Sequence, residues 1–246
     1  MAKDNFSAQS KDYAAFRPKL QQEVYDFVIK QVSDFNLAWD VGTGNGQTAV
    51  ELSKVFKQVV ATDISENQLA HAVPAPNIIY KKEPAEHSSL EDHSVDLITI
   101  AQAIHWFNFD EFYTTVRRVA KPGAVIAAFS YAMFRAEDKK VDDLIQQFYA
   151  DSFPYWDPER KYIDAHYKTI PFPFKEIAAP VFYISYEWNI EQVIGYMRTW
   201  SANQHYRKKF GEDLVSDIFK NELMIVWPSE EKISLRFPVY IRIGRV

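Results

Sequence analysis

A glycine-rich stretch near residue 40 constrains the fold of this chain more than any other feature. Residues 37–47 read LAWDVGTGNGQ, the pattern of a short buried strand, a turn and the beginning of a helix. Three glycines in five positions permit positive φ angles and a close approach of the backbone to a ligand. The free N–H groups at the beginning of the following helix point back at the turn. The stretch therefore predicts a cradle for a nucleotide-type ligand.

Strands alternate with short helices along the first half of the chain. The predicted strands cover 37–41, 59–63, 77–81, 95–101 and 124–130, and the predicted helices between them cover 46–56, 66–72 and 110–120. Ser65 is suited to cap the second of these helices, and the sequence Lys121-Pro122-Gly123 is expected to end the third. This alternation is typical of βαβ units, so we expect an α/β fold with a mostly parallel sheet.

The second half changes rhythm and is rich in aromatic residues. A helix is expected over 137–150, an irregular segment over 151–180, a strand over 181–188, helices over 190–200 and 212–225, and a strand over 233–243. Pro238 favours an edge or a bulge for this last strand. We expect one domain over 1–246, with a core of about 34–131 plus strands near 181–188 and 233–243. Segments 132–180 and 190–231 would form a helical, aromatic cap. An N-terminal lid helix is expected over about 6–33, with Pro18 at a helix start.

Composition excludes several classes of function. The chain has no cysteine, so thiolate catalysis and thiolate-bound metal are excluded, and its six histidines show no metal-ligand spacing. A net charge of −5 argues against nucleic-acid binding. No apolar run reaches the roughly 18 residues of a membrane span. We therefore expect a cytoplasmic protein that acts without a metal, a membrane or a nucleic acid. We also expect a monomer or homodimer.

Two kinds of nucleotide-binding loop match the glycine pattern. A dinucleotide-binding loop needs a third glycine where this chain has Gln47. Asp40 precedes the loop, and its carboxylate would repel a pyrophosphate but suits a ligand with an ammonium or sulfonium cation. Asp63 ends the second predicted strand, where it can accept hydrogen bonds from both ribose hydroxyls of a nucleoside. The loop therefore favours a cationic nucleoside.

The same residues resemble motifs I and II of the class I S-adenosylmethionine-dependent methyltransferases. The acidic loop 83–90, the strand 95–101 and the Lys-Pro-Gly turn are similar to further patterns of that superfamily. The resemblance implies a Rossmann-like, seven-stranded, mostly parallel sheet with helices on both faces. It places Ala85 and Glu86 near the adenine and Ala101 and Gln102 near the methionine part of the cofactor. The full expected cofactor set is Tyr13, Arg17, Asp40, Gly42, Thr43, Gly44, Gly46, Asp63, Ile64, Ala85, Glu86, Ala101 and Gln102.

A narrower resemblance extends beyond this core. Residues 13–18 (YAAFRP), 102–107 (QAIHWF) and 195–201 (GYMRTWS) together resemble the subgroup of trans-aconitate methyltransferases and related small-molecule carboxyl methyltransferases. The subgroup usually has Tyr-Pro shortly after its Arg-Pro, where this chain has Lys19-Leu20. The resemblance implies O-methylation of a carboxylate on a small molecule. As part of the expected N-terminal lid, Tyr13 and Arg17 would close over cofactor and substrate.

The acceptor site is predicted from residues near the carboxyl edge of the sheet and in the cap. Arg198 would offer a bidentate fork to a substrate carboxylate, and His105 would act as a base if the acceptor were a phenol, alcohol or amine. The expected substrate pocket consists of His105, Trp106, Tyr196, Arg198 and Trp200. Two alternatives stay open: a nicotinamide-dependent oxidoreductase, and a non-catalytic protein that binds S-adenosylmethionine.

Overall fold

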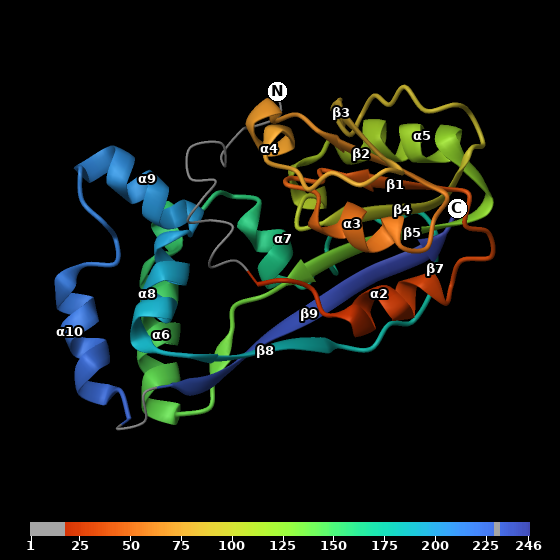
Figure 1. Ribbon diagram of the computed structural model, residues 1–246. Coiled ribbons are helices and arrows are strands. Elements are labelled where there is room, and N and C mark those ends of the chain that lie inside the picture. Colours follow the sequence, from red (N-terminus) through yellow and green to blue (C-terminus); the bar gives the residue numbers. More distant parts are fainter. Residues whose placement is uncertain (1–17, 229–231) are drawn as a thin grey trace.

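The core of the molecule is a sheet whose first five strands are parallel (Figure 1). The computed structural model describes residues 18–228 and 232–246. The parallel strands lie in the order β3-β2-β1-β4-β5 and span β1 (Leu37–Val41), β2 (Gln58–Asp63), β3 (Ile78–Lys82), β4 (Val95–Ala101) and β5 (Ala120–Tyr131). The predicted α/β fold with a mainly parallel sheet is confirmed.

A long antiparallel strand joins this core to the second half of the chain. In β9 (Ile233–Arg245), residues 239–245 pair with β5 and residues 233–239 pair with β8 (Phe182–Trp188). The two-residue strands β6 (Arg135–Ala136) and β7 (Lys175–Glu176) also pair with β9. In the described part of the chain, the sheet therefore consists of seven longer strands and two strands of two residues each. The sequence predicted only the seven longer ones.

Apolar side chains cover both faces of the parallel sheet. Successive residues of a strand point to opposite faces, so Ala38 packs with α2 (Gln22–Ile29) and α3 (Gln47–Ser53), whereas Trp39 packs with α5 (Phe109–Val119). Figure 1 shows α5 on one side of the strands and α2 and α3 on the other. Both faces are thus sealed, and only the strand ends remain open for a ligand.

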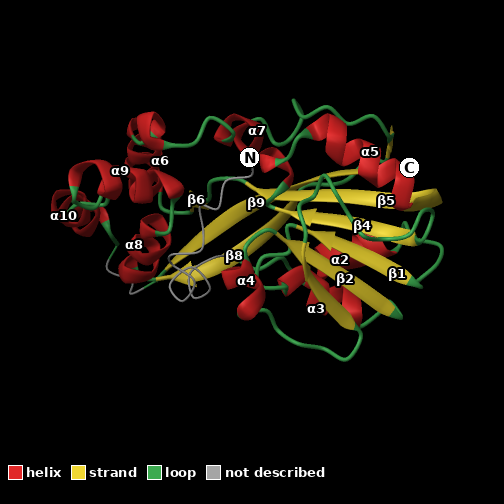
Figure 2. Ribbon diagram, turned by 90° about the horizontal axis from the view of Figure 1, so that it is seen from above, coloured by secondary structure: helices red, strands yellow, loops and turns green. Residues whose placement is uncertain are grey.

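Four helices gather at one end of the sheet and form the cap (Figure 2). They are α6 (Lys139–Asp151), α8 (Ile190–Arg198), α9 (Ser201–Phe210) and α10 (Asp217–Val226). Aromatic rings hold this cap to β9: the Tyr196 ring lies 5.2 Å from that of Phe237 and 6.1 Å from that of Trp200. Burial of large aromatic rings of this kind is a major source of packing energy.

Several predicted boundaries are wrong in detail. The helix α5 ends at Val119, and residues 120–123 already belong to β5, so the Lys-Pro-Gly sequence does not itself end the helix. Pro18 precedes α2, which begins at Gln22. The predicted helix 212–225 begins later, at Asp217, where Ser216 caps it. The helix α9 was not predicted because its sequence SANQHYRKKF lacks an apolar period.

The prediction for Ser65 is confirmed, whereas that for Pro238 is wrong. The hydroxyl of Ser65 accepts a hydrogen bond from the Gln68 amide at 3.3 Å and caps α4 (Glu66–Ala70), as predicted. Pro238, however, lies in an inner strand, because β9 has β8 on one side and β5 on the other. Its carbonyl accepts from the Ala132 amide, one residue beyond the end of β5. The position of the missing proline N–H faces the β5 side as well. Because the pairing of β9 with β5 has ended at Val239, no hydrogen bond between the strands is lost.

Candidate active site

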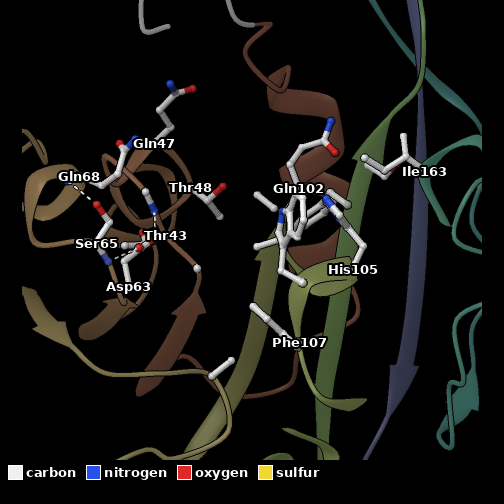
Figure 3. A pocket seen from close by; sticks show the side chains of 18 of the residues that line it. Thr43, Gln47, Thr48, Asp63, Ser65, Gln68, Gln102, His105, Phe107 and Ile163 are labelled. Carbon is white, nitrogen blue, oxygen red and sulfur yellow. Dashed lines mark hydrogen bonds between the residues drawn. The ribbon is translucent and has the colours of Figure 1, made fainter. Parts of the chain in front are cut away.

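A cavity of about 260 Å³ lies at the carboxyl ends of the parallel strands. Its walls come from the loops after β1 to β4, from the end of β5 and from the segment between α6 and β7. Figure 3 shows Thr43, Asp63 and Ser65 on one side of it and Gln102 and His105 on the other. This is the edge at which open α/β sheets place their ligands. The predicted cofactor residues that line it are Gly42, Thr43, Gly44, Asp63, Ile64, Ala85, Glu86, Ala101 and Gln102.

Two of the loop glycines are required for different physical reasons. Gly42 has a φ of +64°, and a Cβ there would lie 2.6 Å from the Ala103 Cβ. Gly46 has a φ of +82°, and a Cβ there would meet the Tyr80 hydroxyl. Gly42 therefore lets the loop pack against Ala103, which lines the cavity with it, whereas Gly46 lies outside the cavity lining and lets α3 begin beside β3.

Asp40 lies beneath the loop and does not line the cavity. Its carboxylate accepts hydrogen bonds from the hydroxyl of Thr43 at 2.5 Å and from that of Thr99 at 2.7 Å. Burial raises the pKa of Asp40 to about 6, and the two hydroxyls partly oppose that rise. In the structure, therefore, Asp40 holds the loop in place rather than facing a ligand cation directly.

The carboxylate of Asp63 connects β2 to the glycine-rich loop. One oxygen accepts from the Gly44 amide and the other from the Ser65 amide, both at 2.8 Å. Asp63 also lines the cavity, so this carboxylate borders the space that a ligand would occupy.

Gln102 presents a buried acceptor near the cavity. Its φ is +54°, its backbone N–H donates to the Phe129 carbonyl, and its side-chain amide donates to the Tyr131 carbonyl at 3.1 Å. The Oε1 atom is buried and has no hydrogen-bond partner within the described chain. An unpaired buried carbonyl oxygen is costly. This atom is therefore suited to accept from a donor on a ligand.

His105 and Trp106 line the cavity, and Figure 3 shows His105 on the side opposite Thr43. His105 is 5% exposed, and its Nδ1 lies 2.9 Å from the Tyr167 hydroxyl. Burial, together with the nearby Arg160 guanidinium, lowers the pKa of His105 to about 3. The imidazole is therefore neutral at physiological pH and is a weak base.

Arg160 is a cavity residue that the sequence did not predict. It begins α7 (Arg160–Asp164), and its Nε donates to the Tyr149 hydroxyl at 2.9 Å and to Asp164 at 3.1 Å. Its guanidinium stacks 4.3 Å over the Trp156 ring. Among the residues that the structure describes, its two terminal amino groups make no hydrogen bond. No periodic pattern marks this residue in the irregular segment 151–180.

Three residues predicted for the substrate pocket do not line the cavity: Tyr196, Arg198 and Trp200. Tyr196 and Trp200 are buried in the aromatic packing of the cap. The Arg198 side chain is 42% exposed and pairs with Asp213 at 3.7 Å. The predicted residues Tyr13 and Arg17 lie outside the described part of the chain, although Pro18, which follows Arg17, borders the cavity.

The described residues hold neither a cluster suited to a metal ion nor a membrane-spanning helix. Within 18–228 and 232–246, no group of three or more histidine or acidic side chains is arranged to hold a metal ion. In the same residues, no helix is long and apolar enough to cross a membrane.

Known proteins similar to this chain are methyltransferases. Residues 39–128 match the family model described as a methyltransferase domain. A Dictyostelium discoideum protein named as a methyltransferase is 31% identical over 98% of this chain and 95% of its own length. This chain belongs to the class I S-adenosylmethionine-dependent methyltransferases. The oxidoreductase alternative is therefore wrong, and the predicted enzyme class and cofactor are confirmed.

Solved structures agree with the assignment to the methyltransferases. A structure from Anaeromyxobacter dehalogenans, described as a type II methyltransferase, is 35% identical to this methyltransferase with a TM-score of 0.85, over 94% of this chain and 98% of that one. A Bacillus halodurans methyltransferase structure shares the fold, with 17% identity and a TM-score of 0.53 over 92% of this chain and 99% of that one.

The cavity of this methyltransferase fits S-adenosylmethionine chemically. Gly42 and Gly44 line the cavity without a side chain to cover their backbone, so a ligand can approach the loop closely. A carboxylate at Asp63 suits a vicinal diol, and the unpaired oxygen of Gln102 suits an ammonium group.

Proposed function

We propose that this methyltransferase methylates a carboxylate oxygen of a small organic acid. The observation that carries the proposal is the Arg160 guanidinium, which lines the cavity with two terminal amino groups free of hydrogen bonds within the described chain. A planar fork of this kind matches the geometry of a carboxylate. Arg160 takes the role that the sequence suggested for Arg198, because Arg198 does not line the cavity.

The cofactor residues divide by the part of S-adenosylmethionine that each would hold. We infer that Asp63 accepts from the ribose hydroxyls, that Ala85 and Glu86 border the adenine, and that Gln102 accepts from the methionine ammonium. The backbone at Gly42 would lie against the methionine part of the cofactor. Asp40 and Gly46 would act indirectly, by shaping the loop.

A carboxylate acceptor suits the chemistry of this site. Bound S-adenosylmethionine supplies a sulfonium methyl group with a neutral thioether as leaving group. A carboxylic acid with a pKa of about 4 is already ionised at neutral pH and needs no base. The protein's contribution is then to align the acceptor oxygen, and alignment is worth up to about 7–11 kcal/mol in intramolecular reactions.

A phenol, alcohol or amine acceptor is the second candidate, because His105 borders the cavity where a base would stand. Such an acceptor must lose a proton, and a base is most effective when its pKa is near the working pH. The lowered pKa of His105, about 3, is far from that range. The distance of this pKa from the working pH favours a carboxylate acceptor. It also supports the proposal that the enzyme is related to the small-molecule carboxyl methyltransferases.

The test is a labelled-methyl transfer screen over small carboxylic acids, phenols and amines, followed by Arg160→Met on the best acid. Loss of hydrogen bonds to a charged group costs about 1.5–3 kcal/mol, so we expect the KM for the acid to rise about 10- to 100-fold. The Kd for S-adenosylmethionine, measured by calorimetry, should stay within about twofold. Arg160→Lys should lie between, because it keeps the charge and loses the fork.

Two outcomes would overturn this function. Transfer to phenols or amines with none to acids would remove the carboxylate acceptor. A raised KM in Arg198→Met together with an unchanged KM in Arg160→Met would return the clamp to Arg198. Thermal unfolding of both variants shows that each is folded before its kinetics are compared.

A further inference from the structure

Tyr167 contacts the imidazole of His105 from outside the cavity lining. Its hydroxyl lies 2.9 Å from Nδ1, the two ring centroids are 5.9 Å apart, and the side chain is fully buried. His105 itself borders the cavity, whereas Tyr167 does not. The two residues are far apart in the sequence, and no motif connects them.

The direction of this hydrogen bond determines which nitrogen of His105 carries the proton. A neutral imidazole has one N–H and one lone pair. If the phenol donates to Nδ1, the proton of His105 is on Nε2. In the opposite direction the phenol would have to donate to another acceptor, and the Ser130 hydroxyl beside it makes no hydrogen bond within the described chain. Nε2 makes no hydrogen bond with a described residue. Solvent or a ligand can therefore hydrogen-bond to Nε2 whether this atom carries the proton or the lone pair. Satisfying the buried phenol therefore favours the Nε2–H form.

The backbone of Tyr167 is held in an unusual conformation that aims this hydroxyl. Its φ is +58°, a region that bulky residues rarely adopt. The Tyr167 amide donates to the Tyr162 carbonyl at 2.7 Å, and Arg242 donates from β9 to the Tyr167 carbonyl at 2.8 Å. Arg242 is itself held by an ion pair with Glu176 at 2.7 Å. Strained conformations that the surroundings enforce are concentrated at functional sites.

We propose that Tyr167 is a positioning residue that keeps His105 in its Nε2–H tautomer, so that the imidazole donates a neutral hydrogen bond to the acceptor carboxylate beside Arg160. This role rests on the proposed carboxylate acceptor. It assigns to His105 the work of a donor instead of a base. Two donors of different charge would then hold the same carboxylate and restrict its orientation towards the methyl group.

The first test reads the tautomer directly, without any substrate. Long-range ¹H–¹⁵N spectra of histidine-labelled enzyme distinguish Nε2–H from Nδ1–H, and the signal of His105 is the one lost in His105→Gln. We expect Nε2–H in the wild type and in the control Tyr162→Phe, because Tyr162 lies in the adjacent helix α7 and does not line the cavity. Tyr167→Phe, which keeps the ring, should give a mixture of tautomers. An Nδ1–H wild type, or an unchanged Tyr167→Phe spectrum, would overturn the proposal.

The second test separates a donor from a base by kinetics. The side-chain amide of glutamine places an N–H near the position of Nε2, whereas that of asparagine reaches only the position of Nδ1. His105→Gln should therefore retain kcat/KM for the acid within about tenfold, and His105→Asn should lose about tenfold more. Equal losses in both variants would contradict the donor role. If the wild type methylates no acid, the proposed function fails, while the spectra still decide the tautomer.

Discussion

The carboxylate of Asp63 accepts a hydrogen bond from the Gly44 amide at 2.8 Å, which ties the end of β2 to the loop after β1. The same carboxylate accepts from the Ser65 amide at the beginning of α4. One side chain thus sets the spacing of two loops and also borders the cavity.

Removal of the Asp63 carboxylate should abolish binding of S-adenosylmethionine. Asp63→Ala loses both the loop hydrogen bonds and the acceptors for the ribose, so we expect the Kd to rise more than about 100-fold. Asp63→Asn keeps one acceptor oxygen and should show a smaller loss. Calorimetric titration with the cofactor measures both, and cofactor affinity in Asp63→Ala equal to that of the wild type would exclude this role.

Gly42→Ala should damage the enzyme more than Gly123→Ala. Both glycines have positive φ, at +64° and +82°, so both variants place a side chain in a backbone conformation that L residues rarely adopt. Only at Gly42 does the added Cβ meet a neighbour, Ala103, whereas the space around Gly123 is open. We expect about 1 kcal/mol of destabilisation for Gly123→Ala and several for Gly42→Ala. Urea unfolding compares the two, and equal losses would show that the contact with Ala103 relaxes freely.

Asp40 should make the fold less stable as the pH rises. Its pKa is about 6 in the native state and close to 3.8 when unfolded, so the native state holds the proton more tightly between these values. Stability is therefore lost as the pH rises from about 4 to about 6, by about 1.4 kcal/mol per pH unit. Asp40→Asn lacks this dependence. As the pH rises across this range, the unfolding free energy of Asp40→Asn should therefore increase relative to that of the wild type.

The control for the Asp40 experiment is the wild type at pH 7 to 8. Asp40 is ionised there in both the native and the unfolded state. The difference in unfolding free energy between Asp40→Asn and the wild type should therefore become constant. A difference that is constant from pH 4 to pH 8 would show that Asp40 keeps its ordinary pKa in the fold.

The aromatic cap should depend on Trp200 for its packing. This side chain is 1% exposed and contacts the rings of Tyr149, Trp156 and Tyr196. Trp200→Ala should cost about 3–5 kcal/mol of stability. Ile225→Ala is the matched control, since Ile225 is 84% exposed on α10 and should change stability by less than about 0.5 kcal/mol. Urea unfolding tests both, and similar losses would contradict the assignment of Trp200 to the core.

The cofactor half of the site could be predicted from short stretches of sequence. The strand before Gly42, the glycines that permit positive φ and the acid at the end of the next strand lie within about 30 residues of one another in a repeating βαβ pattern. Each depends on local sterics or on the regular alternation of strand and helix. Their placement in the structure follows the predicted order closely, with helix ends shifted by a few residues.

The proposed acceptor half of the site depends on long-range packing. His105 follows β4, Arg160 begins a five-residue helix in an irregular segment, and Tyr167 lies just beyond it. No periodicity brings these three together, and the motif around Arg198 pointed to a residue that pairs with Asp213 instead. They meet because β9 and the cap fold this segment back over the strand ends. Local patterns therefore determine the cofactor, since backbone geometry acts within a few residues. The residues of the proposed acceptor site come together only when distant segments pack.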